Sequence, residues 1–191
     1  MDEMVIRAMA KWPDVPAVFG WLRLDRRGRW WIRDELVSNP GIAAFIGRNY
    51  LADASGRYFF QNGPQQVFVA LDATPWVFHL ESNDAGAPQI VDQTGQAAVP
   101  VAAGIDEEGN LYLQTGRGFG IVDERELVRL VELIYHPSGR KADDAMLMEW
   151  LAQGAAAAPL ELRLSGAPAL LLLPLQKNAL AARFGFIPQP G

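Results

Sequence analysis

Residues 57–81 read RYFFQNGPQQVFVALDATPWVFHLE, and the spacing of strand-forming and turn-forming residues in this stretch decides the fold class. Residues 58–61 are aromatic and prone to form a strand, and Asn62-Gly63-Pro64 has the composition of a tight turn. Side-chain types then alternate with a period of two over residues 66–71, and again over residues 76–81 after a second turn. The stretch predicts three strands in an antiparallel meander.

A turn signal of the form Asp-x-x-Gly occurs three times before a strand-like run, at Asp25–Gly28, Asp53–Gly56 and Asp106–Gly109. In such a turn the aspartate side chain caps the backbone, and the glycine takes the left-handed conformation of a bulged hairpin. The intervals between the copies are unequal, which excludes a solenoid. The three copies predict that hairpins start several strands and that much of the sheet is antiparallel.

Three other stretches carry helix signals. Pro40 begins a short amphipathic stretch, and Asp123 and Asp143 each stand as an N-cap before apolar residues at helical spacing. In contrast, Ser82–Gln96 is rich in Gly, Pro, Asn, Asp and Gln, which predicts a long loop.

These signals predict an α+β fold that is rich in antiparallel hairpins and meanders and has about three short helices. We expect an N-terminal β-rich half over residues 1–95 and a C-terminal α+β half over residues 96–191, meeting between residues 82 and 103; these can be two small β-barrel-like halves, and one compact domain over residues 1–191 is the alternative. The predicted core consists of large apolar side chains, namely Trp21, Trp30, Phe59, Phe68, Val69, Leu71, Trp76, Phe78, Leu113, Leu127, Leu130, Val131, Trp150 and Leu162.

The composition is that of an ordinary folded protein, with 50% hydrophobic and 20% charged residues. The longest apolar run, residues 167–175, is interrupted by two prolines and is too short for a membrane helix, so we expect no membrane association. The N-terminus opens with acidic residues and lacks the pattern of a secretory signal, which predicts a cytoplasmic location. The absence of cysteine excludes disulfides and thiolate chemistry.

Residue types that usually carry catalysis are sparse. His79 alternates with apolar residues and His136 precedes a proline, so we interpret both as structural, and neither has a second metal ligand at a standard spacing. Gly116–Gly120 follows a strand-like run but lacks the lysine and the glycine spacing of a phosphate-binding loop. We therefore predict no catalytic residue, no metal ligand and no cofactor.

A basic hairpin offers a nucleic-acid alternative. The formal net charge is −5, but residues 1–60 carry +2 and the remainder −7. Arg26, Arg27, Arg29 and Trp31 combine the cations and the indole that single-strand-binding proteins use for phosphate contact and base stacking. In an ordinary sheet, arginine stems cover tryptophan faces in the same way. The acidic remainder argues against nucleic acid as a partner.

A polar loop beside the aromatic strands is the best candidate for ligand binding. It brings amide donors and acceptors to a rim, where such groups recognise a peptide or a small polar ligand. The candidate ligand-binding residues are Arg57, Gln61, Asn62, Gln65 and Trp76.

Several motifs point to a known family. They are Lys11-Trp-Pro-x-Val-Pro, Gly20-Trp-Leu-x-Leu-Asp-x-x-Gly-x-Trp, Arg48-Asn-Tyr, Gly56-Arg-Tyr-Phe-Phe-Gln-Asn-Gly-Pro-Gln and Ala182-Arg-Phe-Gly-Phe-x-Pro-x-Pro. Together they resemble a family of small proteobacterial proteins of unknown function over nearly the whole chain. More loosely, the order of elements is similar to another uncharacterised bacterial family built from two small β-barrel-like halves. Neither resemblance implies an activity, a cofactor or a catalytic residue.

Three hypotheses about function remain open at this point. The favoured one is a non-catalytic binding or protein-interaction module with a protein or small-molecule partner, and a homo-oligomer is compatible with it. The second is an enzyme that uses carboxylate or arginine chemistry on a small polar or phosphorylated substrate. The third is a single-stranded nucleic-acid-binding protein.

Overall fold

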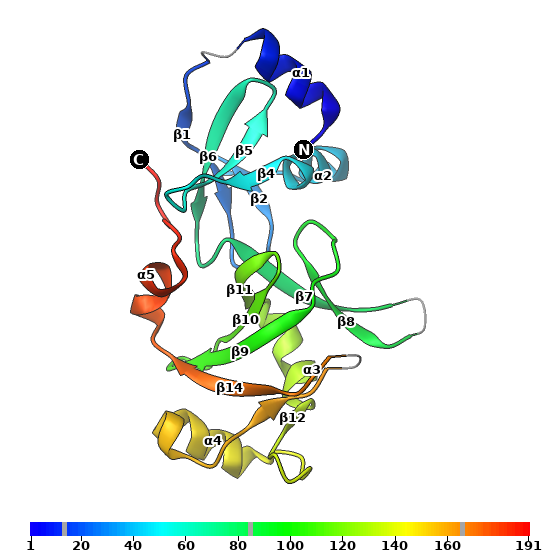
Figure 1. Ribbon diagram of the computed structural model, residues 1–191, viewed down its shortest axis with the longest axis vertical. Coiled ribbons are helices and arrows are strands. Elements are labelled where there is room, and N and C mark those ends of the chain that lie inside the picture. The colour runs from blue at the N-terminus through cyan, green and yellow to red at the C-terminus, as the bar shows by residue number, and fades with distance from the viewer. Residues whose placement is uncertain (13–14, 84–85, 165–166) are drawn as a thin grey trace. The chain divides into compact units, whose positions relative to one another are not determined.

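The computed structural model describes residues 1–12, 15–83, 86–164 and 167–191, which form two β-sheets and several helices (Figure 1). These residues divide into two compact units: the first unit is Met1–Pro75 with Ala181–Gly191, and the second unit is Trp76–Leu180. In the described residues both sheets are open, with a strand at each edge. The predicted α+β class is confirmed. The division into halves at residues 95 and 96 stays a prediction.

The first unit contains a six-stranded sheet in the order β3-β2-β1-β6-β5-β4. Its strands are β1 (Val18–Leu24), β2 (Trp30–Ile32), β3 (Glu35–Leu36), β4 (Tyr50–Ala52), β5 (Tyr58–Asn62) and β6 (Gln65–Leu71). All neighbouring pairs are antiparallel except β1 and β6, which run parallel. The hairpins predicted around residues 25–28 and 62–64 are both present.

The register places the turns of this sheet at two opposite ends. At one end, β1 leads into the Asp25 turn and β4 leads into the Asp53 turn; we call this the Asp-capped end. At the other end lie the β2–β3 turn, which begins at Arg33, and the β5–β6 turn between Asn62 and Gln65; we call this the open end.

Two helices near the N-terminus, α1 and α2, belong to the first unit. The predicted helix at Pro40 is α2 (Pro40–Arg48), and the Asn39 side chain accepts hydrogen bonds from the first free N–H groups of the helix. Phe45 of α2 packs edge-to-face on Phe60 of β5, with ring centroids 5.5 Å apart, so α2 covers this face of the sheet. The sequence did not reveal α1 (Glu3–Lys11), whose N-cap residue makes no side-chain capping bond.

The second unit contains an eight-stranded sheet in the order β12-β13-β14-β9-β10-β11-β7-β8. Its strands are β7 (Trp76–Ser82), β8 (Pro88–Asp92), β9 (Pro100–Asp106), β10 (Leu111–Thr115), β11 (Gly118–Val122), β12 (Ile134–Tyr135), β13 (Glu161–Leu162) and β14 (Leu170–Leu175). The meander prediction is wrong for its third strand, because β7 pairs with β8 and β11 and not with β6. The predicted long loop instead contains β8.

The described residues contain more helices than the three predicted. The caps at Asp123 and Asp143 are confirmed: Asp123 opens a 3-10 turn (Glu124–Glu126) followed by α3 (Leu127–Val131), and Asp143 opens α4 (Asp144–Gln153). The additional helices are α1 and α5 (Leu180–Phe184), with short 3-10 turns at Gly154–Ala156 and Lys177–Ala179. Pro13 and Asp14 of the first family motif, and Asp84 and Ala85 of the predicted long loop, lie outside the described residues.

One turn geometry recurs in both units. At Asp25, Asp53 and Asp106 the backbone bonds close the turn as predicted, and the carboxylate accepts backbone N–H groups two and four residues on. Asp92 makes the same set of bonds, which the sequence analysis missed because no long strand-like run follows it. His136 closes a similar turn with its ring nitrogen.

Most predicted core residues are buried, including Val69, Phe78 and Leu113. Trp21 is a correction, because 48% of its surface is exposed. Leu127 and Val131 are half-buried. Within the described ranges, the helices fall short of the length and apolar character that a bilayer crossing requires.

Candidate functional site

A cavity of about 600 Å³ lies in the first unit, between α2 and the sheet. Its apolar walls come from β1, β5, β6 and α2, and the deepest of them are Leu22, Ile46 and Phe60, which are buried. The face is apolar because alternate residues of these strands point toward α2 and pair across the sheet, as Phe60 does with Val67. The volume falls within the range of pockets that bind small molecules.

Large apolar side chains around this cavity remain exposed. Trp21, Ile32 and Ile42 line it and keep 48%, 42% and 49% of their surface accessible. They come from β1, β2 and α2, so they converge on one concave surface although they are distant in sequence. Exposed apolar groups gathered around a concavity usually mark a binding surface.

The polar lining of the cavity consists of two amides at the open end. Asn62 and Gln65 face each other as a register pair across the β5–β6 turn. The Gln65 Nε2 donates to the carbonyl of Pro16 over 3.3 Å, and the Asn62 side chain makes no hydrogen bond to a described residue. Both amides therefore retain hydrogen-bonding capacity for a ligand.

Arg33 stands beside the cavity at the same end of the sheet. Its backbone N–H donates to the carbonyl of Trp21 over 2.7 Å, and its guanidinium lies 3.8 Å from the centroid of the Trp21 ring. Its φ of 53° is in the left-handed region, which non-glycine residues rarely adopt. Among the described residues, no carboxylate forms an ion pair with its guanidinium.

The structure brings together two of the five predicted ligand-binding residues. Asn62 and Gln65 line the cavity, but Gln61 points to the opposite face, where its Nε2 donates to Gly63 and its buried Oε1 has no partner among the described residues. Arg57 is held by Asp53, with Nε 2.7 Å from Oδ2. Trp76 belongs to the second unit, where it is buried.

Most cavity residues were not among the proposed ligand-binding residues; they include Trp21, Ile32, Ile42 and Phe45, with Arg33 beside them. Their sequence signal was ambiguous, because an apolar residue on a strand or helix is usually a core residue. Only the packing of α2 on the sheet shows that these side chains surround an empty volume.

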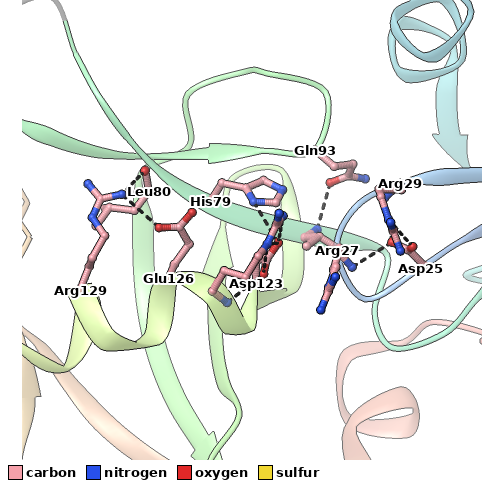
Figure 2. Close-up of polar contacts among 11 residues, drawn as sticks. Asp25, Arg27, Arg29, His79, Leu80, Gln93, Asp123, Glu126 and Arg129 are labelled. Atoms are coloured by element: carbon pink, nitrogen blue, oxygen red, sulfur yellow. Dashed lines mark hydrogen bonds and ion pairs between the residues drawn. The ribbon is translucent and has the colours of Figure 1, made fainter. Parts of the chain in front are cut away.

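In the basic hairpin proposed for nucleic acid, the Asp25 carboxylate binds groups of the arginines that follow it (Figure 2). Arg29 Nε and Trp31 Nε1 donate to Asp25 Oδ2 over 2.7 and 2.9 Å, and Arg29 also lies over the Trp31 ring. Burial disfavours the charged carboxylate, but the hydrogen bonds from Trp31 and Arg29 outweigh it and lower the pKa of Asp25. The aspartate thus offsets the Arg29 charge and occupies the indole N–H that base recognition would need.

His79 lies near a buried carboxylate in the second unit. Its Nδ1 is 3.5 Å from Asp123 Oδ2 (Figure 2). Arg125 Nε donates to both oxygens of that carboxylate. Burial opposes ionisation of Asp123, yet the Arg125 contacts prevail and lower its pKa. Because Asp123 is engaged by Arg125 and by its own turn, its burial has a structural explanation. The described residues contain no group of side chains suited to hold a metal ion.

The glycine-rich stretch at Gly116–Gly120 is the turn and second strand of the β10–β11 hairpin. A side chain at Gly120 would come within 2.5 Å of the carbonyl oxygen of Trp76 on the neighbouring strand β7. Close approach of strands therefore explains this glycine, and β11 separates the stretch from the helix that a phosphate cradle would require.

A family model described as "Protein of unknown function (DUF2946)" and named DUF2944 matches residues 1–191. The chain belongs to this family, which confirms the resemblance to an uncharacterised family. Its proteobacterial origin and the individual motifs remain predictions.

Two solved structures are similar to the chain. The chain is similar to the crystal structure of a DUF1285 family protein from Silicibacter pomeroyi DSS-3, with a TM-score of 0.53 at 14% identity, over 94% of this chain and 98% of that chain. A DUF1285 family protein from Shewanella baltica OS155 gives a TM-score of 0.41 at 14% identity, over 59% and 91% of the two chains. At this identity the first similarity concerns the fold alone. No curated protein matches the chain in sequence.

Proposed function

We propose that this protein is a non-catalytic binding module and that the cavity between α2 and the first sheet binds a small, largely apolar molecule. The observation that carries the proposal is the coincidence of a cavity of about 600 Å³ with exposed apolar side chains from three different elements. Water contacts apolar surface at this site, and a ligand that displaces the water gains the hydrophobic free energy of burying it.

The arrangement of polar groups supports a ligand with one polar end. The walls formed by Leu22, Phe45 and Phe60 offer no side-chain hydrogen-bonding group, whereas Asn62 and Gln65 stand at one end of the sheet. An apolar body directed toward the walls and a polar group near the amides match this distribution.

Titration calorimetry with three ten-carbon probes tests the proposal: decanoate, 1-decanol and decylamine, each below its aggregation limit. We expect at least one probe to bind with one-to-one stoichiometry. The variant Val67→Phe places a ring in the cavity and should abolish binding of every probe. The control Leu171→Phe adds the same ring at an exposed position of β14 and should leave binding unchanged. Absence of binding by all three probes, or binding that survives Val67→Phe, contradicts the proposal.

A further inference from the structure

We propose that the ligand of this cavity is an apolar monocarboxylate of medium chain length and that Arg33 binds its carboxylate. This inference rests on the proposed function of the cavity and adds the chemical class of the ligand. It arises from the position, the backbone conformation and the missing ion-pair partner of Arg33.

The position of Arg33 is fixed at the cavity by two neighbours that line it. Ile32 precedes it in the chain. The Trp21 carbonyl accepts a hydrogen bond from the Arg33 backbone N–H over 2.7 Å, and the Arg33 guanidinium lies 3.8 Å from the centroid of the Trp21 ring. A guanidinium stacked on an indole keeps its in-plane N–H groups available for a carboxylate. Arg33 therefore presents donors next to the apolar walls.

The backbone of Arg33 adopts a conformation that an arginine does not favour. Arg33 and Asp34 form the two-residue connection between β2 and β3, where glycine or asparagine usually supplies a positive φ. An arginine with φ of 53° costs stability that a glycine would not. Strain kept at a cavity-side arginine supports a role for its side chain in binding.

Arg33 differs from several other arginines of the same unit in its ion pairing. Arg29 and Arg57 each place Nε 2.7 Å from an aspartate oxygen, and Arg48 pairs with Asp2. No described carboxylate pairs with Arg33, although Asp34 and Glu35 follow it in the chain. A cation beside apolar walls, without a carboxylate partner in the described part of the chain, is complementary to an apolar ligand with a single negative charge.

The open end supplies further hydrogen-bond donors on strands other than the one that precedes Arg33. The strand order places β1 and β6 between the strand that ends before Arg33 and the strand that ends at Asn62. Asn62 on β5 therefore stands with two strands between it and β2, and Gln65 on β6 with only one, at the same end as Arg33, which adds polar groups to this end of the cavity. A carboxylate is held at this end while its hydrocarbon chain fills the cavity.

The three-probe titration also tests this inference when it is extended to variants of Arg33. Wild type should bind decanoate about tenfold more tightly than 1-decanol, the effect of one charge-assisted hydrogen bond, and decylamine least tightly. Arg33→Gln should weaken decanoate about tenfold and leave 1-decanol unchanged. The control Arg183→Gln removes an arginine that also rests on a ring, that of Phe184, and should change neither affinity.

A second variant separates loss of recognition from loss of folding. Arg33→Gly relieves the positive φ, so its thermal midpoint should equal or exceed that of wild type while the preference for decanoate disappears. The inference is overturned if wild type binds 1-decanol as tightly as decanoate, or if either Arg33 variant keeps the preference. If 1-decanol binds and Val67→Phe blocks it, the proposed function stands and only the carboxylate assignment falls; if no probe binds, both fall.

Discussion

The two ends of the first sheet use the same residue types for different purposes. At the Asp-capped end, Asp25 and Asp53 each bind backbone N–H groups and a following arginine, so the charges of Arg29 and Arg57 lie in internal pairs. At the open end, Arg33 rests on Trp21 without a described carboxylate, and the Asn62 amide has no described partner. At one end the two aspartates and their arginines satisfy each other, and at the other end Arg33 and Asn62 keep hydrogen-bonding groups available for a ligand.

This difference teaches that a basic, tryptophan-rich hairpin cannot be interpreted from composition alone. Arg29 and Arg33 flank the same strand, β2, and both lie over indoles. The position of a single carboxylate, that of Asp25, separates the structural arginine from the one available for binding.

The C-terminal residues reinforce the Asp-capped end. Gly56 has a φ of 84°, a Cβ at this position would lie 2.2 Å from the carbonyl oxygen of Gly185, and the Gly56 oxygen accepts the N–H of Ile187. Because both strain and overlap would result, we expect Gly56→Ala to lower the free energy of unfolding by about 3 kcal/mol, measured by urea denaturation.

The matched control is Gly109→Ala in the equivalent turn of the second unit. Gly109 has a φ of 82° with open space around it, so the loss should be only about 1–2 kcal/mol. Equal losses at the two glycines would show that the contact with the C-terminal residues contributes nothing.

The Asp25 carboxylate is the next largest expected contribution. Its side chain is 9% exposed and accepts hydrogen bonds from Arg27, Arg29 and Trp31. We expect Asp25→Ala to cost about 2 kcal/mol of unfolding free energy in urea, because several charged hydrogen bonds are lost together. A cost as small as that of an exposed ion pair, below about 0.5 kcal/mol, would mean that the Asp-capped end does not depend on its cap.

A smaller effect should follow from the pH dependence of Asp53. Burial raises its pKa, but hydrogen bonds from Ser55 and Arg57 lower it more, from 3.8 to about 2. A depressed pKa in the folded state stabilises the fold above the unfolded pKa, and this stabilisation is lost as the pH falls from about 4 to about 2. Asp53→Asn should flatten the change in thermal midpoint over this window; an unaltered slope argues against the assigned pKa.

The smallest effect on stability is expected at the open end. Trp21 is about half exposed, so Trp21→Ala should change the unfolding free energy by less than about 1 kcal/mol. The same variant removes a cavity wall and the support of Arg33, so decanoate binding should weaken at least about fivefold in calorimetry. A stable variant that binds as wild type does would place the ligand elsewhere.

The sequence predicted local structure better than it predicted the site. Turn chemistry at Asp25, Asp53 and Asp106 and the caps at Asp123 and Asp143 depend on neighbours in the chain, so their outcome followed from spacing. Parallel pairing of β1 with β6, and of β7 with β11, depends on residues far apart, and hairpin signals carry no information about it.

Only part of the candidate site could be predicted from the sequence. Asn62 and Gln65 were proposed because amides are visible in a sequence. The cavity itself depends on how α2 packs on β5 beside β1 and β6, and the availability of Arg33 depends on which carboxylates reach it in three dimensions. Neither the cavity nor the availability of Arg33 follows from residues at a fixed spacing in the sequence.

Backbone amide chemical shifts measured during a titration with decanoate test the central claim most directly. We predict saturable shifts that concentrate at the open end and on α2, at Val18, Arg33, Ile42 and Gln65, while the amides of the Asp25 and Asp53 turns stay in place. Shifts that concentrate at the Asp-capped end, or no saturable shifts at all, would contradict the account.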